Sequence, residues 1–288
     1  MTLFDKFLRI RELGIFSIIV VFVIVASIID PRFMTFDSWR AVFLAIPLIL
    51  VMAMGQMMVI ICRHVDISIG SILAFSAIVI GLLFIQFPGL SLWLSLLISA
   101  FVGLIMGLIN GVIVTRFNVH SIIVTLGTLS LYRGLVFIVS GGRQIDRNDI
   151  PEHVVSFSQT SFLFSIPGIL IFSAIIVIVS HLVMRHTVLG REIYATGSNP
   201  VAAHLKGINV TKVTLFCFGV CGMLAGVAGL FYASRFGYVN PGVTGVGIEF
   251  IVIAGVIIGG TSITGGSGSV LGTFLGILLL GIINVALP

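Results

Sequence analysis

The chain has 288 residues, of which 58% are hydrophobic and only 9% are charged. Soluble globular domains carry about 25% charged residues, so this composition excludes a soluble fold and makes lipid the solvent for most of the surface. The formal net charge is +5, but the basic residues are scattered between apolar runs, which argues against a nucleic-acid partner. The cysteines lie inside apolar stretches without metal-ligand spacing, so no metal and no cofactor are expected.

Long windows without a charged residue locate the membrane spans. A spanning helix needs about 20 apolar residues, and the windows lack strand-like alternation, so they predict helices rather than a barrel. The sequence therefore predicts an all-α, polytopic membrane helix bundle that forms a single transmembrane domain over residues 1–288. The predicted spans, about nine in number, cover residues 14–29, 41–62, 67–87, 91–114, 119–140, 162–184, 213–234, 249–260 and 269–287.

The distribution of charge predicts the side of the membrane that each loop faces. With the N-terminus in the cytoplasm, the inner segments hold nine basic and four acidic residues, and the outer segments hold five basic and six acidic residues. Basic residues prefer the cytoplasmic side, so the N-terminus is predicted to be cytoplasmic. The first apolar run is not followed by a small-x-small cleavage site and predicts an anchor, not a cleaved signal peptide. On this topology Asp66 lies in an inner segment, Glu249 in an outer one, and the longest inner loop covers residues 185–212.

Glycines at four-residue spacing mark two helix faces. Such faces let helix backbones approach closely in lipid, where the hydrophobic effect no longer drives helix association. Ordinary packing inside the bundle explains them, and a specific interface between subunits is the alternative. The two sets are Gly103, Gly107 and Gly111, and Gly268, Gly272 and Gly276.

The long inner loop contains the signature of a short helix in water. Asn199 is a good N-cap and Pro200 fits the first helical position, while Gly207 suits the C-terminal cap. Ala202 and Ala203 favour helix between these ends. A helix this short is unstable alone, so it must pack either on its own bundle or on a soluble partner protein.

Two polar interruptions and one buried charge are candidates for function. Asp66, in the segment 63–71, either caps the following helix at the membrane boundary or belongs to a re-entrant break that lines a path. The glycine run 259–269 lacks the lysine of a P-loop, so ATP hydrolysis by this chain is not expected. Arg133 lies near the middle of its span and is a functional candidate, unless it pairs with a carbonyl group or a neighbouring helix end.

The middle of every predicted span lacks Asp and Glu. Carriers coupled to protons or sodium ions usually need an acidic residue at that depth, so its absence argues against an ion-coupled carrier. The sequence also lacks a constellation of nucleophile, base and metal ligands, so we do not expect an enzyme.

Four motifs stand out together: Val65–Ser71, Ile123–Thr128 with Tyr132–Gly134, Leu189–Ile208, and Ile253–Ser269. Taken together, they resemble the sugar-type permease subunits of bacterial ABC importers, the group that includes the ribose, xylose, rhamnose and autoinducer-2 permeases. The autoinducer-2 and rhamnose members look closest. Members of this family usually have about ten spans, so either the sequence is incomplete or the last helix is absent and the C-terminus lies outside.

The resemblance implies a multi-pass permease of the bacterial inner membrane that works with other polypeptides. The implied partners are cytoplasmic ABC ATPase subunits, a second permease subunit in a homodimer or heterodimer, and a periplasmic sugar-binding protein. The implied function is ATP-driven import of a monosaccharide or sugar-like signal, such as rhamnose, a pentose or autoinducer-2. The alternatives are an ion-coupled secondary carrier and a passive channel for a small hydrophilic solute.

The resemblance also assigns residues to two roles. The predicted ATPase-coupling residues are Gly190, Arg191, Gly197, Asn199, Pro200, Ala202, Ala203 and Gly207. The predicted residues of the translocation path or its gate are Asp66, Ser68, Gly70, Thr125, Arg133, Glu249, Gly259, Gly260, Gly265 and Gly266.

Overall fold

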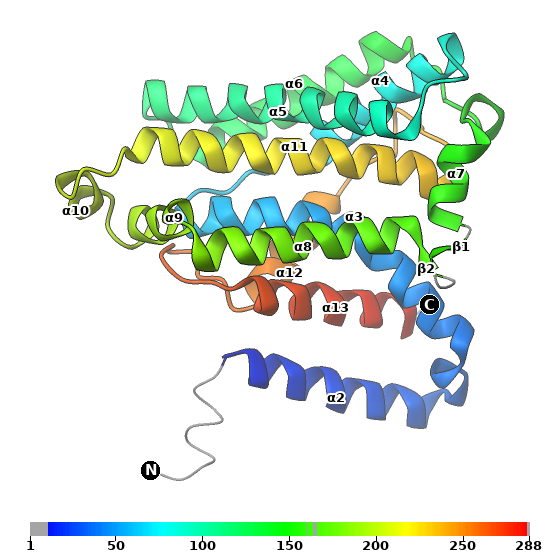
Figure 1. Cartoon of the computed structure of the whole chain (residues 1–288), viewed down its shortest axis with the longest axis horizontal. Coiled ribbons are helices and arrows are strands. Elements are labelled where there is room, and N and C mark those ends of the chain that lie inside the picture. Colours follow the sequence, from blue (N-terminus) through cyan, green and yellow to red (C-terminus); the bar gives the residue numbers. More distant parts are fainter. Residues whose placement is uncertain (1–10, 160, 164–165, 287–288) are drawn as a thin grey trace.

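The computed structural model describes residues 11–159, 161–163 and 166–286, which form a helix bundle (Figure 1). The elements in chain order are α2 (Arg11–Ile29), η1 (Pro31–Met34), α3 (Phe36–Ile61), α4 (Ile69–Gln86), α5 (Leu92–Phe117), α6 (Ser121–Ser140), η2 (Arg147–Asp149), α7 (Glu152–Gln159), β1 (Ser161–Leu163), β2 (Ile166–Pro167), α8 (Gly168–His186), α9 (Val188–Ser198), α10 (Pro200–Leu205), α11 (Val210–Phe236), α12 (Ile248–Ile258) and α13 (Val270–Ala286).

Every predicted span contains one helix, and the described part of the chain has 7 helices long and apolar enough to cross a membrane. The predicted all-α membrane bundle is therefore confirmed. Two spans need correction. The span predicted from residue 162 begins with the antiparallel pair β1 and β2, so its helix starts at Gly168. Helix α12 has 11 residues and is about 16 Å long, too short to cross a hydrocarbon core of about 30 Å alone.

Two of the helices begin inside the bundle after a non-helical segment. Residues 62–68 lead from α3 into α4, and residues 237–247 lead from α11 into α12. The starts of these two helices meet, because Gly70 of α4 packs against Gly245 and Glu249. Irregular backbone at this depth needs protein partners for its polar groups, and the Val65 N–H finds one in Ser121 Oγ at 3.1 Å. For residues 63–71 the structure therefore agrees with the re-entrant break and not with a simple helix boundary.

The glycine face of α5 packs inside the chain. Gly103 and Gly107 lie directly against Gly222 and Gly226 of the central helix α11, so close that a Cβ on any of them would meet backbone atoms of the other helix. Gly276 of α13 packs in the same way against α12. These contacts confirm ordinary tight packing as the reason for the four-residue spacing of the glycines.

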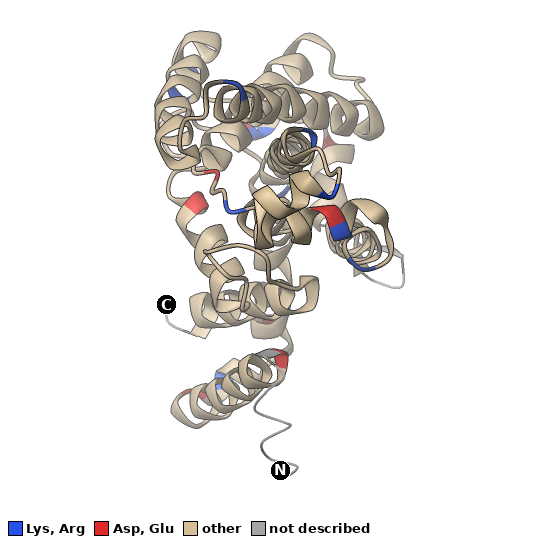
Figure 2. Ribbon diagram, turned by 90° about the vertical axis from the view of Figure 1, so that its left-hand side faces the viewer, with Lys and Arg blue, Asp and Glu red and all other residues tan. Residues whose placement is uncertain are grey.

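The two ends of the bundle differ in structure. Helices α9 and α10 lie at one end, and α7 with the β1–β2 pair lies at the other (Figure 1). Figure 2 looks onto the α9–α10 end, which carries the last turn of α8 and the first turn of α11. The basic residues of that end in the described chain are Arg63, Arg116, Arg185, Arg191, Lys206 and Lys212.

The loop predicted to hold a short helix holds two. Helix α10 is the predicted one, and its Asn199 cap accepts a hydrogen bond from the Ala202 N–H at 3.0 Å. Gly207 follows the helix with a φ of 84°, a conformation that suits the predicted C-terminal cap. Helix α9 was not predicted, and it begins at a Thr187 cap whose side chain accepts from the Gly190 N–H at 3.1 Å.

Candidate functional site

A buried polar cluster lies where α4 begins, formed by Asp66, Ser68, Asn110 and Tyr132. Asp66 Oδ1 accepts hydrogen bonds from the Ser68 N–H at 2.9 Å and from Ser68 Oγ at 2.6 Å. Asn110 Nδ2 donates to Asp66 Oδ2 at 3.3 Å and to Ser68 Oγ at 2.8 Å, and Tyr132 Oη donates to Asn110 Oδ1 at 3.2 Å. The cluster joins three helices and the break through charge-assisted hydrogen bonds.

The cluster holds the backbone of the break as well as its side chains. The Gln56 carboxamide of α3 pairs with Asp66 when its nitrogen faces the Asp66 carbonyl oxygen at 3.3 Å and its oxygen faces the Asp66 N–H at 3.2 Å. Thr125 Oγ1 donates to the Val65 carbonyl oxygen at 3.3 Å. Asp66 is 0% exposed and lies two residues before Ser68, the cap position of α4. It is therefore an interior carboxylate, not the boundary cap weighed above.

A second acidic residue, Glu249, also lies inside the bundle. It is in the first turn of α12 and is 6% exposed, and its carboxylate packs against Gly70 in the first turn of α4. Two helix N-termini thus face one carboxylate, an arrangement that helix dipoles stabilise. The prediction that Glu249 lies in an outer segment is wrong, because its side chain is buried inside the bundle. The middle of every predicted span still lacks Asp and Glu, but Asp66 and Glu249 are buried next to the starts of two spans. Glu249 follows the polar segment 237–247, which the sequence suggests is a surface loop. In the structure that segment re-enters the bundle.

Arg133 of α6 faces the other break. Its Nη1 donates to the Thr244 carbonyl oxygen at 2.6 Å, and its guanidinium lies close enough to Glu249 to interact electrostatically. Pairing with a carbonyl group, the structural role considered for Arg133, is therefore confirmed. Arg133 connects α6 to the segment that precedes α12.

At the α9–α10 end, three segments that are far apart in the sequence meet in what we call the α9 junction: Ile61, Arg63, Gly197, Ser198 and Gly266. Arg63 donates from Nε to the Gly197 carbonyl oxygen and from Nη2 to that of Ser198, both at 2.5 Å. The Gly266 N–H donates to the Ile61 carbonyl oxygen at 2.9 Å, and Gly197 packs directly on that same oxygen. The junction therefore ties α9 to the end of α3 and to the glycine run.

Two ionisable side chains border the junction. The Tyr194 hydroxyl donates to the Gly268 carbonyl oxygen at 2.9 Å, and burial raises the pKa of this tyrosine. Burial, with a smaller contribution from His120, lowers the pKa of His64 to about 4. His64 is therefore neutral at physiological pH and adds no charge beside Arg63.

The predicted ATPase-coupling residues divide into two groups. Gly190, Gly197 and Ala203 are buried against their own chain, and Pro200 is half-buried. The exposed members are Arg191, Asn199, Ala202 and Gly207. Two apolar side chains of α10 that the sequence did not single out, Val201 and Leu205, are 70% and 81% exposed.

The predicted path residues also fall into separate places. Asp66, Ser68, Gly70, Thr125, Arg133 and Glu249 surround the starts of α4 and α12. Gly259 packs on Gly272 and closes the turn between α12 and α13, and Gly260 has a φ of 85°. Gly265 and Gly266 lie at the α9 junction, beside Arg63 and Ser198. The glycine run therefore accompanies the loop 185–212 and not the buried cluster.

Sequence reasoning missed four residues of these sites. Asn110 and Gln56 are uncharged polar side chains in otherwise apolar windows, which is the only signal they give. Tyr132 was quoted only as part of a motif, and Arg63 only as a basic residue of an inner segment and as the start of the polar segment 63–71.

Comparison with known proteins places the chain in a family. The family model described as "Branched-chain amino acid transport system / permease component" matches residues 40–287. The autoinducer 2 import system permease protein LsrC of Yersinia enterocolitica is 34% identical over 254 residues, which cover 88% of this chain and 69% of the relative. The ribose import permease protein RbsC of Haemophilus influenzae is 34% identical over 275 residues, which cover 94% of this chain and 84% of the relative. No solved structure matches the chain.

These relatives confirm the resemblance inferred from the four motifs. The matched residues include the polar cluster, the α9 junction and both helices of the loop 185–212. The chain belongs to the family of permease components of branched-chain amino acid-type transport systems and is a multi-pass membrane permease of the ABC importer class.

Proposed function

We propose that the chain is the membrane-spanning permease of an ATP-driven importer that carries a monosaccharide or sugar-like signal across the bacterial inner membrane. Rhamnose, a pentose and autoinducer-2 are the candidate substrates, and two of the relatives are named for ribose and autoinducer 2. ATP hydrolysis takes place in separate cytoplasmic ATPase subunits. A second permease subunit completes the membrane part, and a periplasmic binding protein delivers the sugar.

The observation that carries this proposal is the position of α10. The helix presents Val201 and Leu205 to solvent at the end predicted to be cytoplasmic. Exposed apolar side chains on a helix of six residues favour a protein partner, because such a helix is not stable by itself. We infer that α10 is the surface on which the ATPase docks.

The contacts of α9 connect the docking surface on α10 to the interior of the bundle. Helix α9 directly precedes α10, and Arg63 holds the carbonyl groups at the end of α9. Arg63 is three residues before Asp66, so a displacement of α9 reaches the break that the polar cluster holds. In this proposal the ATPase moves α10 and α9 together, and the break before α4 transmits the movement to the start of α12.

The experiment must also test the ion-coupled alternative, because Asp66 and Glu249 lie inside the bundle, where a carrier could use an acidic residue to bind a proton or a cation. The deciding experiment reconstitutes the chain into vesicles with the ATPase and binding protein that co-purify with it. We expect uptake of D-ribose, L-rhamnose or autoinducer-2 only when ATP is supplied. Uptake driven by an ion gradient without ATPase would favour a secondary carrier, and equilibration without either energy source would favour a channel.

A substitution in α10 tests the docking surface. We expect Leu205→Glu to lower the amount of ATPase that co-purifies in mild detergent by about tenfold, the effect of losing one central apolar contact. Thermal stability of the purified chain should not change, because Leu205 is 81% exposed. The matched control is Phe117→Glu, an exposed apolar residue at the same end but outside α10. Equal ATPase recovery from both variants would remove α10 from the interface.

A further inference from the structure

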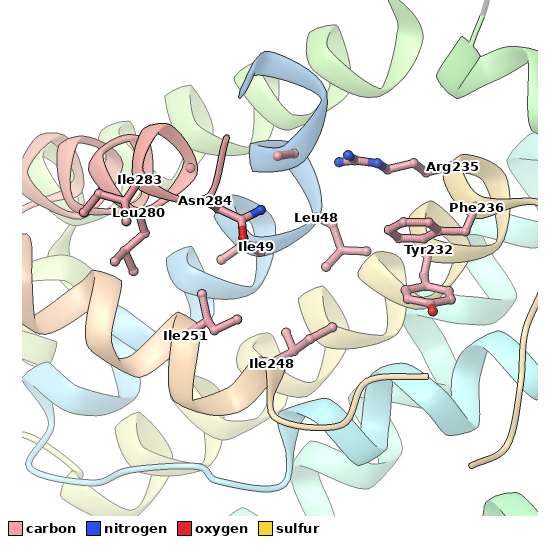
Figure 3. Close-up of a pocket in the computed structure, with 12 residues that line it drawn as sticks. Leu48, Ile49, Tyr232, Arg235, Phe236, Ile248, Ile251, Leu280, Ile283 and Asn284 are labelled. Carbon is pink, nitrogen blue, oxygen red and sulfur yellow. The ribbon is translucent and has the colours of Figure 1, made fainter. Parts of the chain in front are cut away.

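A cavity of about 380 Å³ opens between α3, α11, α12 and α13 in the half of the bundle away from α9 and α10 (Figure 3). We call it the α11–α13 cavity. Its rim holds Arg235 in the last turn of α11 and Asn284 near the end of α13. Its floor holds Ile248 and Ile251 of α12, next to the acidic Glu249. The cavity thus lies beside the first turn of α12, which carries Glu249.

The two polar side chains of the rim lack protein partners that would explain them. The Arg235 guanidinium lies over the Phe236 ring, 5.2 Å from the ring centroid, and takes part in neither of the ion pairs found among the described residues. The Asn284 carboxamide makes no hydrogen bond to any described residue. Polar groups at an apolar membrane surface are costly unless something satisfies them. Here a hydroxylated ligand or water would do so.

The rest of the lining suits a small sugar. Phe236 and Tyr232 line one side, with ring centroids 4.5 Å apart, and an aromatic wall complements the apolar C–H face of a sugar ring. The guanidinium supplies hydrogen-bond donors and the carboxamide both donors and acceptors, which match hydroxyl groups. The volume lies at the small end of the range for ligand pockets. It fits a monosaccharide better than a drug-sized molecule.

We propose that the α11–α13 cavity is the vestibule in which the permease receives its sugar, with Arg235 and Asn284 as the hydrogen-bonding contacts. This rests on the proposed function and adds the site to it. A lipid chain would not need the guanidinium or the carboxamide. A second copy of the chain that filled the cavity would exclude water from Asn284. Either of these occupants would keep water away from residue 284, and the experiment distinguishes both of them from a water-filled vestibule.

The experiment measures access to the cavity in intact cells that express the assembled importer. Asn284→Cys is treated with a membrane-impermeant maleimide, and the native cysteines give little background because Cys62, Cys217 and Cys221 are at most 2% exposed. Leu97→Cys, on the lipid-exposed face of α5 near the same end and 65% exposed, is the control. We expect Asn284→Cys to react at least about tenfold faster than the control. The sugar that the wild-type importer takes up, among D-ribose, L-rhamnose and autoinducer-2, should slow this reaction.

A second variant separates binding from folding. Arg235→Gln should raise the KM for uptake about tenfold while the maximal rate and the thermal stability stay unchanged, since one charged hydrogen bond to the sugar is lost. Arg32→Gln, an exposed arginine at the same end but outside the cavity, should leave KM unchanged. Arg235→Lys should show a smaller increase in KM than Arg235→Gln, because lysine keeps the positive charge and a hydrogen-bond donor.

The outcomes distinguish the two proposals. If wild-type vesicles show no ATP-dependent uptake, the proposed function fails, and the labelling rate still reports whether water fills the cavity. If uptake is ATP-dependent but Asn284→Cys reacts no faster than Leu97→Cys, lipid or a second copy occupies the cavity and the vestibule is overturned. Fast labelling that the transported sugar does not slow would also overturn it.

Discussion

Gly197→Ala is expected to prevent the chain from reaching its folded state at normal yield. A Cβ at this position would lie on the carbonyl oxygen of Ile61 and 2.7 Å from the backbone nitrogen of Gly266. Both atoms are backbone and are hydrogen-bonded to each other, so neither can rotate away as a flexible side chain would. Overpacking of this kind costs about 3 kcal/mol or more, and here it separates α9 from α3 and from the glycine run together. Thermal unfolding followed by size-exclusion chromatography in detergent measures the effect.

The matched control for this substitution is Gly134→Ala. Gly134 is also a helical glycine, but the position of its Cβ has no neighbouring atom within 4 Å. Alanine is favoured over glycine within a helix by roughly 0.5–1 kcal/mol, so this variant should be at least as stable as the wild type. A Gly197→Ala chain as stable as Gly134→Ala would show that the α9 junction does not hold the two regions together.

The helices followed from the sequence because lipid imposes a simple rule. Charged residues mark the ends of apolar windows, and inside hydrocarbon only a helix satisfies the backbone, so α5 and α11 lie within a few residues of their predicted bounds. The breaks followed only in part: a re-entrant break was one of two alternatives for residues 63–71, and none was predicted for residues 237–247. In residues 62–68 and 237–247, backbone polar groups form hydrogen bonds with side chains of other helices, such as Ser121 and Arg133. The sequence alone does not show which distant side chains will lie next to these segments in the folded chain.

The parts of the candidate site that could be predicted are those that depend only on neighbouring residues in the sequence. The Asn199 cap and the φ of Gly207 depend on neighbours in the sequence, so α10 could be predicted. Helix α9 contains Gly190 and Gly197, which weaken helix propensity, and both glycines are explained only by the backbone atoms that pack on them. The partners of Asp66 come from α5 and α3, so the motif around Asp66 indicated its importance but not its environment.

Asp66→Ala is expected to destabilise the chain by about 3 kcal/mol or more, because it removes the acceptor of three donors in a site that is 0% exposed. Each buried donor left without a partner costs about 1–3 kcal/mol. A loss of 3 kcal/mol corresponds to a fall of roughly 5 °C in the thermal midpoint of a domain of this size. The control is Ser99→Ala. Ser99 is also 0% exposed, but its Oγ has no hydrogen-bond partner in the described chain, so its removal should not destabilise the protein.

Exchanging the two polar partners tests whether hydrogen bonding explains the role of Asp66. In Asp66→Asn alone, the new amide nitrogen faces either Asn110 Nδ2 or the donors of Ser68, so about 1–2 kcal/mol is lost. The double variant with Asp66→Asn and Asn110→Asp restores one acceptor and one donor between the two side chains and should recover most of that loss. Its coupling energy follows from a double-mutant cycle of thermal midpoints.

Transport by the same exchange variant separates the importer from an ion-coupled carrier. If ATP hydrolysis in another subunit drives uptake, the carboxylate at residue 66 serves to hold the break before α4, and uptake should recover together with stability in the double variant. If a proton or cation must bind Asp66 itself, moving the carboxylate to residue 110 should abolish uptake in a chain that is fully folded. Thermal midpoint and uptake therefore change together in the first case and separate in the second, so a folded but inactive exchange variant would count against the ATP-driven importer.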